Sequence, residues 1–325
     1  MSKIAVLIGN TYIHWVSVIV VAAALTAIFI FLASYRKSGG NLNAAALFIP
    51  LALVLSVLFS RIVHWYCRFE LYGGLISAIT DFTGGGYALF GVFIGTMLSA
   101  IIVSVIKLEK NALLLFDCMA PAAAFGIALG RLASFFDSSD RGMVIESIKS
   151  LPLVSAVNNP VTGAPEYRFA TFLFQAIFCA LLGFWLISML KVQRKRGDVG
   201  SGEVFLFFLS AYGAGQIVLD STRYDSLFLR SNGFISIVQI AGAVCVVLVL
   251  FYYAIELWRY RGFKATHVLF IILSLALIGG AGFMEYYVQR HGDRAIFSYS
   301  VMTACLIGLN LITLNLQRKV RPQAE

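Results

Sequence analysis

Charge is scarce in this chain of 325 residues. Asp, Glu, Lys and Arg together make up only 13% of it, whereas 60% of the residues are hydrophobic and the mean hydropathy is +0.86. Soluble globular domains carry about 25% charged residues, so this composition excludes a soluble domain. We expect an all-α polytopic membrane protein.

Residues that bind metals or nucleotides are also sparse. The five cysteines are isolated along the chain, which argues against a disulfide framework and against a paired-cysteine metal site. The four histidines are scattered, and we find no phosphate-binding loop. The sequence therefore predicts neither a metal nor another cofactor. The net charge of +9 is spread over short segments between apolar runs, so it does not indicate a nucleic-acid partner.

Long apolar runs dominate what remains. Each is near the roughly 20 residues needed to cross a bilayer as a helix. The first lacks a small-residue cleavage site and is too long for the apolar part of a signal peptide, so we expect it to stay as a helix. The pattern predicts nine spans, at about 10–34, 43–66, 87–106, 112–135, 168–190, 203–220, 233–255, 266–287 and 296–316.

The basic residues divide the connecting segments into two sets. One set holds 14 basic residues against four acids, and the other holds most of the acids and the long loop 137–167. By the positive-inside rule the basic set is cytoplasmic, which puts the amino terminus outside and the carboxyl terminus in the cytoplasm. The basic set comprises Arg36, Lys37, Lys107, Lys110, Lys191, Arg194, Lys195, Arg196, Arg259, Arg261, Lys264, Arg318, Lys319 and Arg321.

The segment 129–142, LGRLASFFDSSDRG, is the main polar concentration next to an apolar run. Arg131 lies inside the apolar end, where a charge costs about 2.5–3.5 kcal/mol unless it is paired or hydrated. Ser134 and Asp137 follow it in a polar cluster at the expected membrane surface. We interpret this segment as a binding site for an anionic lipid head group. The alternative is an ordinary interfacial arginine that extends toward water.

Two further groups of residues are candidates for the same site. Arg61 and His64 are three apart on one helical face and can point inward, although aromatic and basic residues there also suit an interfacial belt. The glycine run at 84–86, which includes Gly85 and Gly86, can surround an oxyanion with backbone N–H groups or allow close helix packing.

A second polar stripe lies near residue 220. Tyr212, Gln216, Asp220 and Arg223 are spaced as one stripe on a helix within an otherwise apolar run. An acid and an arginine three apart can simply neutralise each other, so a structural ion pair is the alternative to a functional role.

These motifs resemble those of the prolipoprotein diacylglyceryl transferase family. Gly130-Arg131 through Asp137 is similar to the family's Gly-Arg-x-Gly-Asn-Phe-x-Asn, and Asp117, Ala120 and Pro121 are similar to its upstream Asp–Ala-Pro pattern. Two further family motifs are similar to the glycines from Gly85 to Gly95 and to the stretch from Tyr212 to Arg223. The resemblance covers about residues 10–256. It implies a seven-helix core over 1–256. Outside the resemblance, the apolar runs predict an added helix pair and cytoplasmic tail over 257–325.

The resemblance also implies an activity and a location. It implies transfer of a diacylglyceryl group from phosphatidylglycerol to the lipobox cysteine in the signal peptide of a prolipoprotein, within a bacterial cytoplasmic membrane. We expect Arg131, with Arg223 or Arg61, to hold the lipid phosphate. Further residues expected at the substrate site are Asp220, Ser134, Gly85, Gly86 and Tyr212.

The chain departs from the family pattern where the cysteine thiol would be activated. The family's histidine falls on Phe90, and an arginine of the Tyr-Gly motif falls on Gln216. His64 is then the histidine best placed to act as a base, and Asp137 is the carboxylate best placed to do so. The alternative is a catalytically degenerate protein that binds lipid or a partner on the same scaffold. A transporter is less favoured because the sequence shows no inverted repeat.

Overall fold

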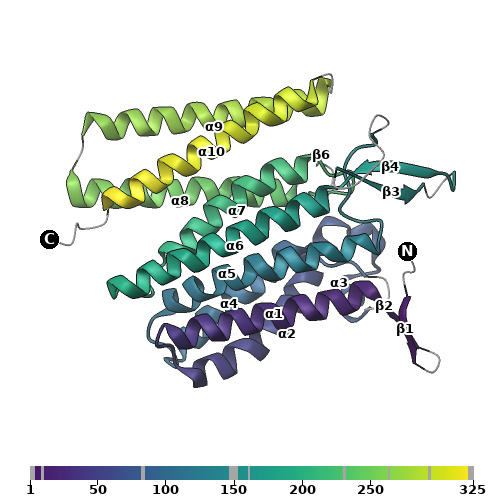
Figure 1. Cartoon of the computed structure of the whole chain (residues 1–325), viewed down its shortest axis with the longest axis horizontal. Coiled ribbons are helices and arrows are strands. Elements are labelled where there is room, and N and C mark those ends of the chain that lie inside the picture. Colours follow the sequence, from purple (N-terminus) through teal and green to yellow (C-terminus); the bar gives the residue numbers. More distant parts are fainter. Residues whose placement is uncertain are drawn as a thin grey trace. The chain divides into compact units, whose positions relative to one another are not determined.

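The computed structural model describes residues 4–8, 11–81, 85–145, 153–159, 162–229, 232–262, 264–291 and 294–320 (Figure 1). Its main elements are long helices, joined by turns and three short antiparallel hairpins. The α-helices are α1 (Trp15–Lys37), α2 (Leu42–Cys67), α3 (Leu75–Thr80), α4 (Leu89–Val105), α5 (Ala112–Arg131), α6 (Thr171–Arg196), α7 (Glu203–Ser221), α8 (Ile237–Arg261), α9 (Ala265–His291) and α10 (Ala295–Val320).

The remaining elements are short. The 3-10 helices are η1 (Phe69–Leu71) and η2 (Leu132–Phe135), and the strands are β1 (Ile4–Ile8), β2 (Thr11–His14), β3 (Val154–Asn158), β4 (Pro165–Phe169), β5 (Phe228–Leu229) and β6 (Asn232–Ser236). Each strand pairs with its neighbour in sequence, in the order β1-β2, β3-β4 and β5-β6.

The helices confirm the all-α polytopic class. Within the described ranges, eight helices are long and apolar enough to cross a membrane, and α4 is a shorter apolar helix of 17 residues. Each of the nine predicted spans overlaps one of these helices, although the predicted starts at 10, 168 and 233 lie up to five residues before the helix, in or next to strands β2, β4 and β6. The short helix α3 and the hairpins were not predicted, because such short elements carry little periodicity.

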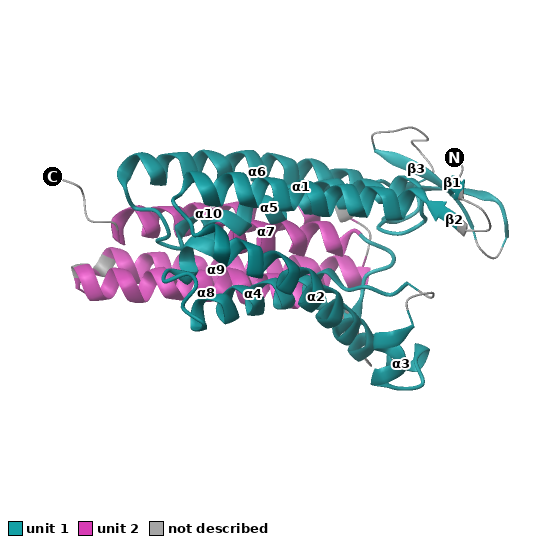
Figure 2. Ribbon diagram, turned by 90° about the horizontal axis from the view of Figure 1, so that it is seen from below, with its two compact units in different colours: residues 1–205, 223–237 teal, residues 206–222, 238–325 magenta. Residues whose placement is uncertain are grey.

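The chain divides into two compact units, coloured separately in Figure 2. The first unit comprises residues 1–205 and 223–237, and the second comprises 206–222 and 238–325. The second unit therefore groups most of α7 and α8 with α9 and α10. The family-based boundary after residue 256 stays a prediction.

In the first unit, α2 packs closely on α4. A Cβ atom on Gly91 would lie 2.3 Å from the Phe59 carbonyl oxygen, and one on Gly95 would lie 2.5 Å from that of Leu55. Only glycine permits this approach of the two backbones. These two glycines belong to the motif from Gly85 to Gly95, and they serve helix packing.

Helix α5 lies against α1 and α6 and is the most buried of the long apolar helices. Its internal acid, Asp117, is fully buried. The Asp117 carboxylate accepts hydrogen bonds from the backbone N–H groups of Gly202 (2.9 Å) and Phe205 (3.0 Å) and from the Gln193 side chain (3.2 Å). It thus caps the amino end of α7 from a neighbouring helix, where N–H groups lack helical partners.

The second unit has its own apolar core. One cluster contains Ala214, Val246, Ala281, Met302, Leu306 and Leu309. Helices α7 and α8 touch backbone to backbone, since a Cβ on Gly213 would lie 2.7 Å from the Gly242 carbonyl oxygen. Helix α9 packs along α10, and the Ser210 hydroxyl of α7 donates to Asn310 of α10 at 2.8 Å.

The long loop 137–167 contains extended structure. Strands β3 and β4 pair from Val154↔Phe169 to Asn158↔Pro165. The other edge of β4 receives residues 142–145, because Gly142 N–H donates to the Phe169 carbonyl and Ile145 N–H to that of Tyr167, each at 2.8 Å. Arg168 takes part in this pairing. It is thus a residue of β4 and lies before the start of α6. Residues 146–152 and 160–161 of this loop lie outside the described residues.

Candidate functional site

Two arginines converge on one carboxylate where α5 ends. One Asp140 oxygen, Oδ1, lies 2.6 Å from Nη1 of Arg131 and 2.7 Å from Nη2 of Arg223. The other oxygen, Oδ2, accepts a 3.0 Å hydrogen bond from the Ser134 hydroxyl. The two guanidinium groups therefore flank a single oxygen atom, an arrangement that suits any small oxyanion.

Asp225 completes this arginine cluster, which we define as Arg131, Ser134, Asp140, Arg223 and Asp225. The Asp225 carboxylate lies 3.1 Å from Nη2 of Arg223 and accepts the Asp140 backbone N–H at 2.8 Å. Asp140 has a φ of +58°, in the left-handed region that non-glycine residues rarely adopt. This local conformation directs both the N–H and the carboxylate of Asp140 into the cluster.

The electrostatics of the cluster favour the charged form of Asp140. Burial alone would raise the pKa of this carboxyl, but the neighbouring guanidinium groups of Arg131 and Arg223 lower it by more. The pKa of Asp140 is therefore well below its ordinary value. The cluster thus combines two arginines with two carboxyl groups.

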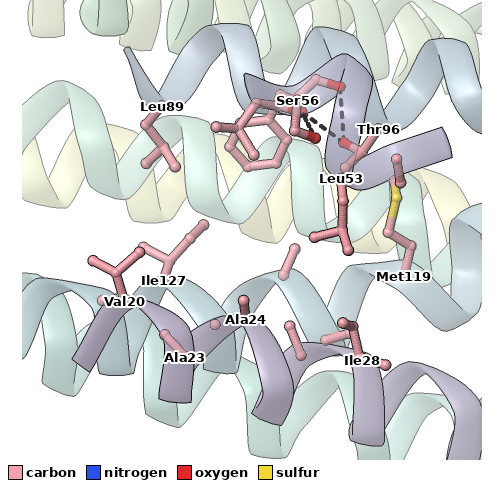
Figure 3. A pocket seen from close by; sticks show the side chains of 18 of the residues that line it. Val20, Ala23, Ala24, Ile28, Leu53, Ser56, Leu89, Thr96, Met119 and Ile127 are labelled. Carbon is pink, nitrogen blue, oxygen red and sulfur yellow. Dashed lines mark hydrogen bonds between the residues drawn. The ribbon is translucent and has the colours of Figure 1, made fainter. Parts of the chain in front are cut away.

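The arginine cluster adjoins an apolar cavity of about 500 Å³. Arg131 and Asp140 line the cavity together with residues of α1, α2, α4 and α5. Figure 3 shows Val20, Ala23, Ala24 and Ile28 on one wall and Leu53, Ser56 and Thr96 on the other. The Ser56 and Thr96 hydroxyls on this wall both donate to the Val92 carbonyl.

Arg61 is buried and bonded to backbone carbonyls. Its guanidinium donates to the carbonyls of Ala78 (2.7 Å) and Gly86 (2.9 Å), and also to those of Asp81 and Gly85. Gly85 and Gly86 have φ values of +69° and +80°, so they take a turn that favours glycine. Their carbonyls bind Arg61, while Gly84 lies outside the described residues.

His64 lies beside this turn. Its Nδ1 is 2.8 Å from the Tyr72 hydroxyl, and a Cβ on Gly86 would lie 2.8 Å from the imidazole Cε1. The guanidinium of Arg61 is also 5.2 Å from the ring centroid of Tyr87, which lines the cavity. Arg61, His64 and the glycine turn thus form one packed group behind the cavity wall.

Comparisons with known proteins identify the family of this chain. The family model described as prolipoprotein diacylglyceryl transferase matches residues 3–258. The chain belongs to this family. Relatives named phosphatidylglycerol–prolipoprotein diacylglyceryl transferase, from Streptococcus pyogenes serotype M5 (strain Manfredo) and serotype M1, are 27% identical over 254 residues. That match covers 78% of this chain and 94% of each relative.

The family match ends within α8, so α9 and α10 lie beyond it. At two of the positions where the sequence departs from the family motifs, the structure places Phe90 in the first turn of α4 and Gln216 within α7. Gln216 is buried, and Phe90 is half-buried beside Gly91, at the contact with α2.

The structure corrects one prediction about the second polar stripe. Tyr212, Gln216 and Asp220 are buried on α7, but this helix ends at Ser221. Arg223 therefore lies beyond the helix, where it forms an antiparallel bridge with Gly142. This bridge brings Arg223 beside the segment that carries Asp140. The carboxylate partners of Arg223 therefore include Asp140 and Asp225.

Asp137 lies at the edge of the arginine cluster. Its carboxylate accepts the Ser138 N–H at 2.7 Å, and its backbone carbonyl accepts a hydrogen bond from Arg141. Arg141 is itself buried and donates to the Ser134 carbonyl at 3.1 Å. Arg141 thus holds both ends of the segment from Ser134 to Asp137.

Sequence reasoning missed Asp140, Asp225 and Arg141 as individual parts of the site. Asp140 and Arg141 lay in the polar cluster that drew attention to segment 129–142, so composition indicated the region. Sequence spacing could not show which acid bridges the two arginines, because the bridge depends on a left-handed residue and on a distant segment. Arg168 pairs with Glu166 at 2.8 Å, and its guanidinium lies 4.1 Å from the centroid of the Tyr224 ring.

Proposed function

We propose that this multi-pass membrane protein transfers the diacylglyceryl group of phosphatidylglycerol to the lipobox cysteine of prolipoproteins. The observation that carries the proposal is the Asp140-bridged pair of arginines at the end of an apolar cavity. Family membership and the names of the relatives support the same activity.

The cavity and the cluster suit the two parts of such a lipid. Acyl chains suit the apolar walls from α1, α2, α4 and α5. The phosphate fits beside Arg131 and Arg223, whose guanidinium nitrogens already flank one carboxylate oxygen of Asp140. Ser134 adds a hydroxyl to the same place. Arg61, Gly85 and Gly86 then shape the wall behind Tyr87 instead of touching the phosphate.

The reaction needs the phosphate site most when the leaving group departs. The cysteine sulfur forms a bond to the terminal glyceryl carbon of the diacylglyceryl group, and the bond between that carbon and the phosphate oxygen breaks. The bond electrons leave with glycerol phosphate, which gains one negative charge. Arg131 and Arg223 would stabilise this developing charge in a site with little water. Asp140 and Asp225 would position the arginines without touching the substrate.

The thiol must also lose its proton before or during the attack. We propose His64 as the base because it is the histidine best placed to replace the one missing at Phe90, and its Nδ1 is 2.8 Å from the Tyr72 hydroxyl. Asp137 is the second candidate, beside the arginine cluster. Tyr212 and Asp220 stay predicted substrate-site residues on the basis of the family motif.

We further propose that the amino terminus faces the outside of a bacterial cytoplasmic membrane and that the carboxyl terminus is cytoplasmic. The support is the concentration of basic residues in alternate connections, such as Arg194, Lys195 and Arg196 at the end of α6. The arginine cluster then lies at the outer surface, the side on which a secreted prolipoprotein presents its cysteine.

A catalytically degenerate lipid-binding protein is the second candidate, and the phenylalanine at position 90 favours it. One experiment separates the two functions: mass spectrometry of a lipobox peptide incubated with the protein in phosphatidylglycerol liposomes. A diacylglyceryl adduct on the cysteine supports the transferase. Retention of phosphatidylglycerol without an adduct, lost on Arg131→Ala, supports the degenerate protein. Neither adduct nor retention overturns both.

A further inference from the structure

The last two helices contact the end of the helix that leads to Arg223. We call α9 and α10 the terminal helix pair; they lie outside the family match, which ends at residue 258. All the contacts described next lie within the second compact unit. They concern the final turn of α7, which ends at Ser221, two residues before Arg223.

The first contact comes from α10. The Tyr299 hydroxyl donates to the Ser221 carbonyl at 3.3 Å. The last four carbonyls of a helix have no N–H partner in the helix itself, so they need donors from elsewhere. A neighbouring carbonyl of the same turn, that of Leu219, receives the Thr222 hydroxyl at 2.8 Å. Tyr299 therefore supplies part of the cap that ends α7.

The second contact is a relay from α9. The carboxylate of Glu285 accepts hydrogen bonds from the side chains of Gln239 (2.8 Å) and Gln289 (3.1 Å). The same Gln239 amide nitrogen donates to the Ile217 carbonyl of α7 at 3.3 Å. Gln239 and Glu285 are both more than nine-tenths buried. An acid inside an apolar helix is expensive to keep, so its position here calls for a specific role.

We infer that the terminal helix pair fixes the end of α7 and, through the chain that follows, positions Arg223 for the lipid phosphate. Tyr299 and Glu285 are the positioning residues. Neither touches the arginine cluster in this role: they act on the Ile217 and Ser221 carbonyls, and Arg223 follows along the backbone. This inference rests on the proposed function only where it concerns the phosphate.

The test combines local hydrogen exchange with transfer kinetics on the full-length protein. Tyr299→Phe removes one hydroxyl and keeps the ring. The matched control is Ser210→Ala, which also removes one hydroxyl between α7 and α10, but about 16 Å earlier along α7. Glu285→Leu removes the acceptor for Gln239, whereas Glu285→Gln keeps a carbonyl oxygen there.

We expect amide exchange at residues 219–224 to rise about 2- to 10-fold in Tyr299→Phe and Glu285→Leu, as for the loss of one hydrogen bond. Ser210→Ala and Glu285→Gln should exchange there as the wild type does. With phosphatidylglycerol liposomes and a lipobox peptide, the first two variants should show a raised KM for the lipid and a nearly unchanged kcat.

Unchanged exchange at 219–224 in Tyr299→Phe and Glu285→Leu, or an equal rise in Ser210→Ala, would overturn the inference. Altered exchange with an unchanged KM would overturn the step from α7 to Arg223. Absence of transfer by the wild type counts against the proposed function alone, since the exchange measurement decides the role of the terminal helix pair without it.

Discussion

At the scale of single residues, the site depends on how charge is neutralised inside it. Arg131 closes an apolar helix, where an unpaired charge is costly, and Asp140 removes much of that cost by pairing at 2.6 Å. The same carboxylate bonds Arg223, so one residue sets the spacing of both cations. We therefore make separate predictions, one for the activity of an Arg131 variant and one for the stability of an Asp140 variant.

Arg131→Lys keeps the positive charge but loses the planar, multiply donating guanidinium. We expect it to lower kcat/KM for phosphatidylglycerol by about 10²-fold or more, because the developing phosphate charge loses an oriented donor. The measurement is the rate of diacylglyceryl adduct formation on a lipobox peptide. Lys195→Arg, the reverse exchange at the far end of α6, is the control; a fully active Arg131→Lys would remove Arg131 from the phosphate site.

Asp140→Asn should destabilise the protein by about 2–3 kcal/mol at neutral pH, because two guanidinium groups lose a shared charge while Asp225 still offsets Arg223. Since the pKa of Asp140 is lowered in the folded state, its contribution is present above the ordinary carboxyl pKa of about 3.9. The contribution disappears as pH falls toward the lowered value. The difference in thermal unfolding midpoint between variant and wild type should thus shrink below about pH 4. A difference that grows in acid would contradict this assignment.

At the scale of elements, close helix contacts and a cap supplied from another helix hold the frame of the site. Helices α2 and α4 meet at glycines, and they carry one wall of the cavity. Helix α7 begins at a carboxylate from α5, and its other end leads to Arg223. Each of these features can be changed at one position.

Gly95→Ala should lower stability by about 1–3 kcal/mol, because the new Cβ would lie 2.5 Å from the Leu55 carbonyl oxygen and must push α2 and α4 apart. Gly282→Ala in α9 is the matched control, since its Cβ would enter open space. The thermal unfolding midpoint of each purified protein provides the measurement. Equal midpoints for the two variants would show that this helix contact tolerates a methyl group.

Asp117→Ala should lower stability by about 2–4 kcal/mol, because the Gly202 and Phe205 N–H groups lose a buried acceptor. Asp117→Asn keeps one acceptor oxygen and should lose less. Limited proteolysis of the turn 197–202 and the unfolding midpoint together report the effect. If both variants unfold like the wild type, the carboxylate does not cap α7.

At the scale of the whole molecule, the apolar helices and the alternation of basic connections predict which segments face outside. This prediction can be tested in protoplasts with a membrane-impermeant thiol reagent. Asn159→Cys in the β3–β4 hairpin should be labelled in intact protoplasts, whereas Lys195→Cys should be labelled only after lysis. The parent protein controls for its own cysteines. The reverse pattern would invert the proposed orientation.

Much of the fold was predictable because a membrane span is a local property. Hydropathy over about 20 residues suffices to place a helix, and all nine predicted spans meet an apolar helix. Short elements were not predictable in this way. The β3–β4 hairpin has strands of five residues whose stability comes from partners elsewhere, including residues 142–145.

The site was predictable as a region but not as a set of partners. Segment 129–142 stood out because polar residues follow an arginine inside an apolar run. Arg61 also stood out, and the structure shows it bonded to the backbone carbonyls of a glycine turn. Sequence alone could not show which partners each arginine has, since those partners lie on segments that only the fold brings together.

The sequence by itself determined the membrane class, the positions of the spans, the family and the region that carries Arg131. Each of these depends on residues that are close together in the chain, or on motifs with set spacing. Only the tertiary structure decided that Asp140 bridges Arg131 and Arg223, that Arg223 lies beyond α7, and that the terminal helix pair bonds the last turn of that helix. Those facts depend on backbone turns and on contacts between distant segments, for which local periodicity carries no signal.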